Sequence, residues 1–513
     1  PRSANVWQLS GSSRKYPRTF HRTCGRFLVL YLDFNTLNTT SVPEMKASFK
    51  LYLRELFSKY DCLKSSKKLN AYLKKKLAAY TDNLDGLSGP KLLFALPMFA
   101  SMLRNHFELN VFILIDNLDR VVLPHIYNPN FSIMNQIFFI KQLIFRIFAK
   151  NDIQGFLSSR IKLPLDMNIT YYHFLEHHGL SQSYGLTTEE VQSLIVKSNT
   201  NFTITDMSEW YGGYRVVGGD TAVYNTYSVM EALQRGHLAK YWTVPESITH
   251  LQDYFLDRHL NSKIATILHN KRFVLKLATS KSCFRLKRLQ KFVTLRKVNY
   301  RHGLTEAFLL YMQEHGYLVT SQKTNDTVTL TIPNWEITNH INAKFYTIPY
   351  YMDKINITYE RVMEVVDALL RFGTDKDSYK HFVEAVKRVY PVDFAPRNTP
   401  ELHKMLLALF RDSGKFLYAE DEPSLANNSI VLLRRDGMCL VFVVSMDTDE
   451  KETPYANLLT LLKNVDVLKR VKFNAVVTSM YYLGMTVDLD LTVHLNYLRD
   501  QLNPRMSFYI TSF

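Results

Sequence analysis

The chain has 513 residues, a length that suits about two or three domains, each with its own hydrophobic core. Hydrophobic residues make up 46% of the sequence and aromatic residues 13%, which excludes the sparse, highly charged composition of disordered chains. The net charge is +16, and this excess of cations favours polyanions such as nucleic acid as partners. The four cysteines lack paired spacing, so they indicate neither a disulfide framework nor a zinc site.

Residues 1–25 form a basic N-terminal extension, and the first acidic residue of the chain is Asp33. A stretch rich in Arg and Ser and poor in acids is typical of the end of an organelle-targeting segment, although an upstream domain fits equally well. The sequence does not fix a compartment; it favours the mitochondrion or the nucleus.

The first predicted elements alternate between strands and helices. Residues 26–34 form an apolar run that predicts a strand buried on both faces, and residues 110–119 predict a second buried strand with acids at its carboxyl end. Helical spacing of apolar residues occupies 46–80 and 93–106. This order implies a parallel sheet with crossovers. Residues 133–148 are too short and too charged to span a bilayer, so they predict a buried helix.

The remainder of the chain predicts a smaller α/β domain. Alternation over residues 327–332 indicates a half-exposed strand. Helices are expected at 359–372 and 377–389. Three short strands and one helix complete the prediction: strands at residues 429–434, 438–446 and 472–479, with a helix at 454–468.

A basic segment separates the two predicted halves. Between Arg258 and Thr305 the sequence has thirteen Lys or Arg and no Asp or Glu, with aromatic residues interleaved. Two interpretations fit: a surface that neutralises phosphates and stacks bases, or a solvated helix face whose aromatics point inward. The cations expected to contact nucleic acid are Lys271, Arg272, Arg285, Lys287, Arg288, Lys291, Arg296, Lys297 and Arg301.

Residues 209–242 carry a series of aromatic residues and glycines at specific spacings. The motif positions are Trp210, Tyr211, Gly213, Tyr214, Val223, Tyr224, Asn225, Ser228, Val229, Tyr241 and Trp242. Weaker motifs lie on both sides of this segment, in the order in which the family named below has them. They are at residues 111–119, 184–191, 316–319, 332–337 and 401–407. Together these motifs, spread over residues 26–490, resemble the AAA-ATPase-like family that is commonly followed by a PD-(D/E)XK nuclease domain.

The resemblance implies an α/β fold with a parallel-sheet, P-loop AAA-like domain and helical lid region, followed by a smaller restriction-endonuclease-like α/β domain. It places the AAA-like domain at residues 26–250, a basic lid or linker region at 251–355 and the nuclease-like domain at 356–513. Four motif aromatics would then be core and interdomain packing residues: Trp210, Tyr214, Tyr224 and Trp242.

The residues for nucleotide hydrolysis are missing or replaced. A phosphate loop needs the pattern GxxxxGK[ST], which does not occur in this chain. The family's Asp-Glu-Tyr-Asp order is here Asp116, Asn117, Leu118 and Asp119, and Asn cannot act as a general base. We therefore expect Asp116 and Asp119 to cap or solvate the loop after the strand.

The residues for nuclease chemistry are also replaced. Family positions for the magnesium-binding Asp and Glu and for the catalytic Lys align with Ser429, Val443 and Ser445, while Glu401 is retained. A hard cation requires several converging oxygen ligands, which Ser and Val do not supply. The sequence therefore predicts no catalytic residue, no bound metal and no cofactor.

The resulting hypothesis is a catalytically inactive pseudoenzyme that binds nucleic acid, RNA more than DNA, or acts as a scaffold in a larger assembly. The alternative is an active magnesium-dependent nuclease with displaced ligands, or an NTPase whose phosphate loop lies outside this chain. A third interpretation is a structural subunit whose cations meet acidic protein partners. None of these hypotheses includes a membrane span.

Overall fold

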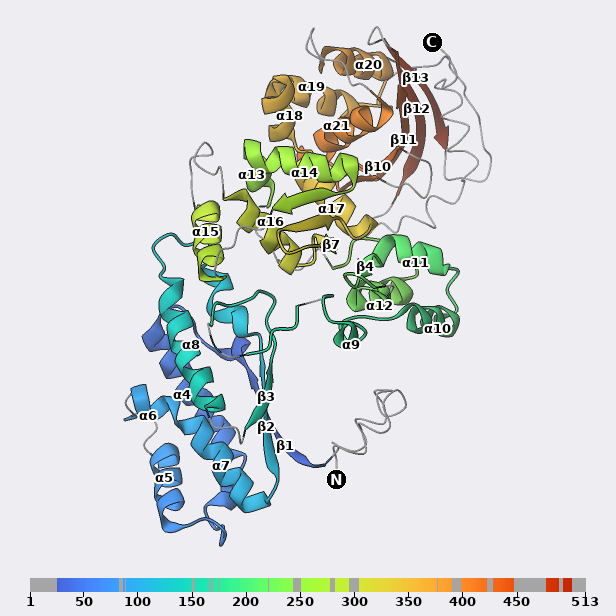
Figure 1. Cartoon of the computed structure of the whole chain (residues 1–513). Coiled ribbons are helices and arrows are strands. Elements are labelled where there is room, and N and C mark those ends of the chain that lie inside the picture. The colour runs from blue at the N-terminus through green and yellow to red at the C-terminus, as the bar shows by residue number, and fades with distance from the viewer. Residues whose placement is uncertain are drawn as a thin grey trace. The chain divides into compact units, whose positions relative to one another are not determined.

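The computed structural model divides into two compact units, each built from three separate stretches of the sequence (Figure 1). The first unit comprises Pro1–Tyr184, Arg215–Thr221 and Asn270–Ile332; the second comprises Gly185–Tyr214, Ala222–His269 and Pro333–Phe513. The domain limits at residues 250 and 355 remain a prediction. The structure describes residues 25–82, 86–87, 89–149, 153–165, 167, 169–173, 175–219, 221–242, 251–276, 282–294, 304–375, 377–389, 398–421, 428–446, 477–488 and 492–500.

A parallel sheet organises the first unit. Its order is β1 (Phe27–Asp33), β2 (Asn110–Asp116) and β3 (Gln154–Leu157), and both strand pairs are parallel, as the sequence predicts. The α/β class is thereby confirmed for this region. The five helices between and after the first strands are α4 (Val42–Ser58), α5 (Ala71–Asp82), α6 (Gly89–Leu93), α7 (Ala95–Phe107) and α8 (Ile133–Phe148).

The helices cover one face of this sheet, as Figure 1 shows. Leu30 and Leu32 of β1 are buried, whereas Val29 and Tyr31, which alternate with them, are about half exposed. The prediction of a strand buried on both faces was therefore wrong, because apolar side chains on the uncovered face gave β1 a continuous hydrophobic run. The expectation that α8 is buried also holds for one side only, since Phe138 on its outer side is 62% exposed.

The first unit also contains a small antiparallel sheet with two helices. The strand order is β6 (Phe273–Lys276), β8 (Thr327–Thr331) and β7 (Val319–Lys323). β8 has the alternating burial that the sequence predicts. The two helices are α15 (Ser282–Thr294) and α16 (Thr305–Glu314), and a short helix α9 (His178–Ser181) lies earlier in the chain. No helix in the described parts of either unit is both long and apolar enough for a bilayer crossing.

A five-stranded mixed sheet forms the core of the C-terminal part of the second unit. β11 and β12 are parallel and the other neighbours are antiparallel. The order is β13 (Val493–Asp500), β12 (Ser479–Val487), β11 (Met438–Met446), β10 (Ser429–Leu433) and β9 (Tyr418–Asp421). β10 and β11 lie where the sequence predicts strands. The expected strand at 472–479 is described only at its end, where β12 begins, and the expected helix at 454–468 lies outside the described residues.

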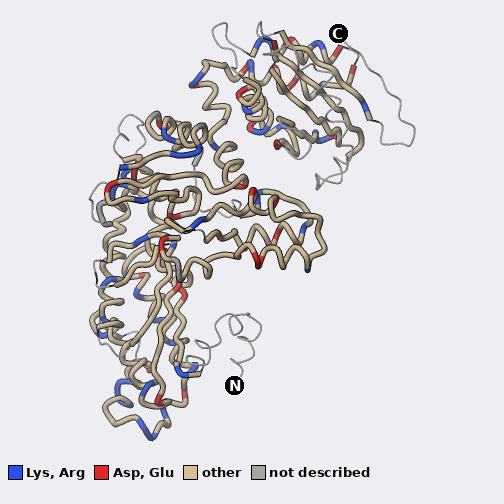
Figure 2. Tube along the Cα trace, turned by 45° about the vertical axis from the view of Figure 1, so that its right-hand side comes forward, with Lys and Arg blue, Asp and Glu red and all other residues tan. Residues whose placement is uncertain are grey.

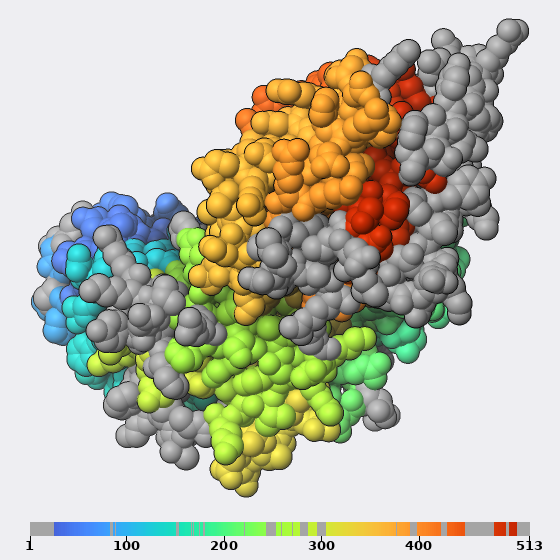
Figure 3. All heavy atoms as spheres, turned by 90° about the horizontal axis from the view of Figure 1, so that it is seen from above, coloured from blue at the N-terminus to red at the C-terminus, as the bar shows by residue number. Residues whose placement is uncertain are grey.

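Helices pack on one side of this sheet. Phe442 of β11 contacts Phe410 and Phe382, with ring centroids about 6 Å apart. Orange atoms of the helices meet red atoms of the last strands in Figure 3. The helices concerned are α19 (Tyr359–Leu370), α20 (Ser378–Val389) and α21 (Thr399–Asp412).

The other described elements of the second unit are mainly helices, and its short strand β5 (Ala222–Val223) pairs with β4 (Tyr214–Arg215). Its helices are α10 (Thr188–Ser198), α11 (Ile204–Tyr211), α12 (Thr226–Arg235), α13 (Leu251–Phe255), α14 (Arg258–Asn270), α17 (Trp335–Phe345) and α18 (Ile348–Ile355). Of the motif aromatics, Tyr214 and Tyr224 are buried, and Trp210 and Trp242 are half-buried.

A buried carboxylate joins three of these motif segments. Glu336, in the first turn of α17, has no exposed surface. Its side chain accepts hydrogen bonds from the Ser228 hydroxyl at 2.8 Å and from the backbone N–H groups of Tyr241 at 2.6 Å and Trp242 at 2.9 Å. Burial raises the pKa of Glu336, while these donors act in the opposite direction. The carboxylate thus links α12, residues 241–242 and α17.

Replacing Glu336 with Ala should lower the free energy of unfolding of the second unit by roughly 3 kcal/mol or more, because three buried donors lose their acceptor. Glu336→Gln keeps a carbonyl acceptor, so its free energy of unfolding should fall less than that of Glu336→Ala. Urea denaturation followed by fluorescence measures both effects. The control is Glu364→Ala, which removes an exposed carboxylate from α19. Equal stability of Glu336→Ala and this control would contradict the structural role.

Candidate functional site

The residues that the sequence predicts as a degenerate nucleotide site, Asp116, Asn117 and Asp119, lie at the carboxyl edge of the parallel sheet, where α/β proteins bind ligands. Asp116 ends β2 and stands in register with Asp33 at the end of β1. Asn117 follows in the left-handed conformation (φ 55°), and its side-chain amide donates to Asp33 Oδ1 at 2.9 Å. The structure therefore places an amide donor between two carboxylates.

The Asp116 carboxylate accepts three hydrogen bonds from neighbouring groups. Oδ1 accepts hydrogen bonds from the Ser158 hydroxyl and from the Asn117 N–H, and Oδ2 accepts one from the Tyr31 hydroxyl at 3.1 Å. The Ser158 bond is the main cause that holds the pKa of Asp116 below its ordinary value. Only the Asn117 N–H among these donors belongs to the loop after β2; Tyr31 lies in β1 and Ser158 follows β3.

Asp119 has a separate partner. Its side chain is fully buried and accepts from Arg160 Nε at 2.8 Å and from the Arg160 backbone N–H at 3.1 Å. Because both oxygens are held, Asp119 fixes the segment after β3 to the segment after β2. Sequence reasoning missed Asp33, Ser158 and Arg160, since only the strand register brings them to this edge.

The three residues that the sequence analysis aligns with nuclease positions come together in the second unit. Ser429 of β10 is in direct register with Val443 of β11, and Ser445 follows two residues later on the same face. All three are buried, and Ser445 Oγ lies 3.2 Å from Thr486 Oγ1 on the parallel strand β12. Val443 packs in an apolar cluster with Val441 and others of that face.

Glu401 lies in a different layer. It is in the first turn of α21, the helix that packs on the Phe442 face, whereas strand alternation directs Val443 to the opposite face. Contacts on either side of Glu401 hold this turn: Thr399 Oγ1 accepts from Met446 N at 2.9 Å, and His403 Nε2 lies 3.3 Å from Ser429 O. The structure thus unites Ser429, Val443 and Ser445 and separates them from Glu401.

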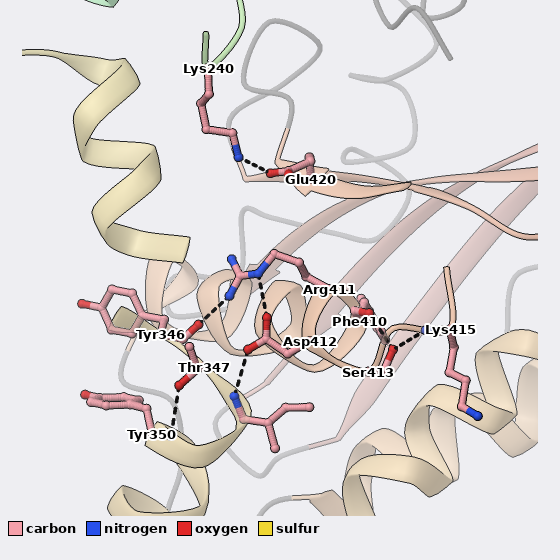
Figure 4. Close-up of polar contacts among 11 residues, drawn as sticks. Lys240, Tyr346, Thr347, Tyr350, Phe410, Arg411, Asp412, Ser413, Lys415 and Glu420 are labelled. Carbon is pink, nitrogen blue, oxygen red and sulfur yellow. Dashed lines mark hydrogen bonds and ion pairs between the residues drawn. The ribbon is translucent and has the colours of Figure 1, made fainter. Parts of the chain in front are cut away.

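Polar contacts fix the end of α21 (Figure 4). Arg411 Nη2 donates to Tyr346 O at 2.8 Å, and Arg411 Nε donates to Asp412 Oδ1 at 2.8 Å. Asp412 Oδ2 in turn accepts from Ile348 N at 3.2 Å. These bonds attach α21 to the segment between α17 and α18.

A small hollow of about 50 Å³ lies beside α21, lined by His403, Lys404 and Glu420 among others. Burial lowers the pKa of His403 and of Lys404. Glu420 already pairs with Lys240 at 2.6 Å, a contact that is drawn in Figure 4. The hollow has room for about one ordered water. Within the described residues of both units, no three His, Cys, Asp or Glu side chains are grouped as metal ligands.

The predicted nucleic-acid contacts are only partly described. Lys287, Arg288 and Lys291 are exposed on α15, and Lys271 and Arg272 are exposed before β6. Figure 2 marks the Lys and Arg of the trace. Arg285 lies on α15 without a described side chain; Arg296, Lys297 and Arg301 lie outside the described residues.

Among the described aromatic residues of the basic segment, Phe292 does not fit the stacking interpretation. Phe292 of α15 has no exposed surface and packs on Phe308 of α16, with ring centroids 4.8 Å apart. Phe273 is half-buried in β6. Phe284 has no described side chain, and Tyr300 lies outside the described residues. The prediction that Phe292 stacks on a base was wrong, because this ring packs α15 against α16.

We predict that Asn117→Asp destabilises the first unit by about 1–3 kcal/mol at pH 7, because it removes a hydrogen bond to Asp33 and adds a like charge. Neighbouring carboxylates raise the pKa of the new acid above its value in the unfolded chain. The loss of stability is therefore present at neutral pH, and it shrinks as the pH falls through the pKa of the new acid. Thermal denaturation from pH 7 to pH 4 measures the difference from the unmodified chain.

The control for this change is Asn199→Asp, at an exposed residue with the same left-handed backbone. It should change stability by a few tenths of a kcal/mol, from the helix dipole alone. A loss at Asn117 that equals the control would contradict the electrostatic explanation.

A second prediction concerns Val443. Val443→Glu should lower the free energy of unfolding of the second unit by roughly 3 kcal/mol or more, because it places a carboxylate in an apolar cluster. Added Mg²⁺ should not restore the stability. Val196→Glu, at a side chain that is 77% exposed, is the matched control and should have little effect. Stabilisation of Val443→Glu by Mg²⁺ would show that cation ligands persist around this position.

Comparison of the chain with models of protein families, with curated proteins and with solved structures finds no match.

Proposed function

We propose that this chain is a non-catalytic scaffold that binds nucleic acid through the cationic side of α15. The observation that carries the proposal is the two-sided character of this helix. Its apolar side chains Leu286, Leu289 and Phe292 are buried, while the cations Lys287, Arg288 and Lys291 are exposed. The surrounding sequence adds cations without any acid from Arg258 to Thr305.

The anchoring of α15 supports a fixed binding surface. Gln290 Nε2 donates to the backbone oxygens of Asn128 and Phe131, both at 2.9 Å, and Phe292 packs on α16. A helix held in this way presents its cations without the entropy cost of ordering the segment on binding. Because Phe292 is buried, contact with phosphates is the favoured mode, and it carries no base specificity.

The state of the two degenerate sites supports the non-catalytic part of the proposal. Asp116 is engaged by Ser158, Tyr31 and its own loop, and Ser429, Val443 and Ser445 supply no anionic ligand. Phosphoryl transfer and phosphodiester hydrolysis both depend on charges that hold magnesium. The resemblance to the AAA-ATPase-like and nuclease-like family then describes the fold from which such a scaffold would derive.

The triple change Lys287→Gln, Arg288→Gln and Lys291→Gln should weaken binding of a labelled RNA oligonucleotide and make it less dependent on salt. Each lost phosphate contact lowers the slope of log affinity against log salt by about 0.7–0.9, so the change should be about 2 units. Filter binding at several salt concentrations, with RNA and DNA of the same sequence, measures affinity and slope.

The matched control removes the same charge from the first unit at other exposed positions: Lys67→Gln, Lys74→Gln and Lys75→Gln. Its salt slope should stay close to that of the unmodified chain. Equal losses in the two triple variants would refute a specific role of α15. Magnesium-dependent cleavage of the oligonucleotide, or nucleotide hydrolysis by the purified chain, would instead favour the enzyme alternative.

A further inference from the structure

A hollow of about 1120 Å³ runs beside β3 in the first unit. Phe138 and Phe145 of α8 line one side of it, residues 159–163 and 169–173 line another, and Gly155 and Phe156 of β3 lie between them. We call this hollow the β3 groove. Its volume is close to the upper end of the roughly 300–1,000 Å³ of small-ligand pockets, so volume alone does not assign the occupant.

The strand next to the groove has an open hydrogen-bonding edge. In the described part of the first unit, only β2 pairs with β3. Ser158, directly after β3, turns both backbone groups towards β2: its N–H donates to Ile115 O at 2.9 Å, and its C=O accepts from Leu118 N at 3.1 Å. Since successive residues of a strand bond to opposite sides, the N–H and C=O of Leu157 and Gly155 face the groove. They are positioned to pair with another strand.

The walls of the groove are exposed and aromatic. Phe138 is 62% exposed, Phe145 53% and Phe156 44%. A group of exposed aromatic rings on a folded protein marks an interaction surface. The sheet register explains how a strand would use them. Phe156 aligns with Leu114 and so lies on the uncovered face, while Gly155 lies against Phe148 of α8 on the other face.

A strand beside β3 would therefore bury alternate side chains against α8 and against Phe156. Gly155 also explains the close approach of these elements, because a side chain there would collide with Ile113 O and with the ring of Phe148. The shape of the groove thus depends on glycine at this position.

The charged residues around the groove indicate which net charge its ligand should carry. Lys141, Arg146 and Lys162 line it, and Arg160 does so as the partner of Asp119. Among the described lining residues Glu314 is the only acid. Residues 1–24 of this chain carry five Lys or Arg and no acid, so they are a poor match by charge. An acidic segment from another protein is the better match.

We propose that the β3 groove binds an extended, acidic segment of a partner protein, which adds to the sheet as a strand beside β3. Backbone hydrogen bonds to Gly155 and Leu157 give the affinity, aliphatic side chains fill the space under α8, and acidic residues face the cations of the rim. The proposal is independent of nucleic-acid binding because it uses none of the α15 cations.

The test is fluorescence anisotropy with a labelled peptide that has alternating valine and threonine in the middle and acidic residues at both ends. Phe138→Gln with Phe145→Gln should weaken its binding at least about tenfold. Both side chains are exposed, so the fold should persist. The matched control, Leu51→Gln with Tyr72→Gln, changes two other exposed apolar residues of the first unit and should leave affinity unchanged.

Two further measurements separate strand addition from simple apolar attraction. The same peptide methylated at alternate backbone amides should bind at least about tenfold more weakly, because it cannot form the ladder. Lys141→Glu with Lys162→Glu should reverse the preference towards a peptide with lysine at both ends. The triple change on α15 should leave peptide binding unaltered.

Three results would overturn the proposal. One is equal binding of the methylated and unmethylated peptides. Another is an RNA oligonucleotide that displaces the peptide and itself loses affinity in the Phe138→Gln, Phe145→Gln variant, which would make the groove an RNA site. The third is self-association that disappears in this variant while the peptide never binds, which would make a second copy of the chain the occupant.

Discussion

The organisation of the second unit depends on one buried carboxylate. Glu336 accepts hydrogen bonds from Ser228 of α12 and from the backbone N–H groups of Tyr241 and Trp242. Burying a carboxylate costs free energy unless its oxygens accept hydrogen bonds. The three segments must therefore pack so that all three donors reach Glu336. Gly213 adds a steric condition, because a side chain there would collide with the Pro333 carbonyl. The motif residues of this region therefore have a packing explanation.

The two candidate sites differ in their charge. At the edge of the parallel sheet, Asp33 and Asp116 accept hydrogen bonds from hydroxyl and amide donors of Ser158, Tyr31 and Asn117. In the mixed sheet, Ser429, Val443 and Ser445 carry no charge, and Val443 packs with neighbouring apolar side chains. The first arrangement is a polar network of carboxylates and their hydrogen-bond donors. The second is part of a hydrophobic core.

The sequence predicted the strands β1, β2, β10 and β11, because short apolar runs bounded by polar residues are strong local signals. It did not predict that β1 is exposed on one face, since hydrophobicity alone does not say which side helices cover. The sequence placed Ser429 and Val443 on two successive strands, but their direct register depends on strand pairing and the separation of Glu401 depends on helix placement. Arg160 and Ser158 have no motif, and only the fold brings them to the acids.

The discontinuity of both units affects how the chain acquires its structure during synthesis. The first unit includes residues up to Ile332, and the second begins at Gly185 and needs Glu336 to satisfy Ser228, 108 positions earlier. Neither unit is complete when its first half leaves the ribosome. The Ser228 hydroxyl and the N–H groups of Tyr241 and Trp242 must therefore wait for their buried acceptor over many residues of elongation, which makes the nascent chain a natural client for chaperones.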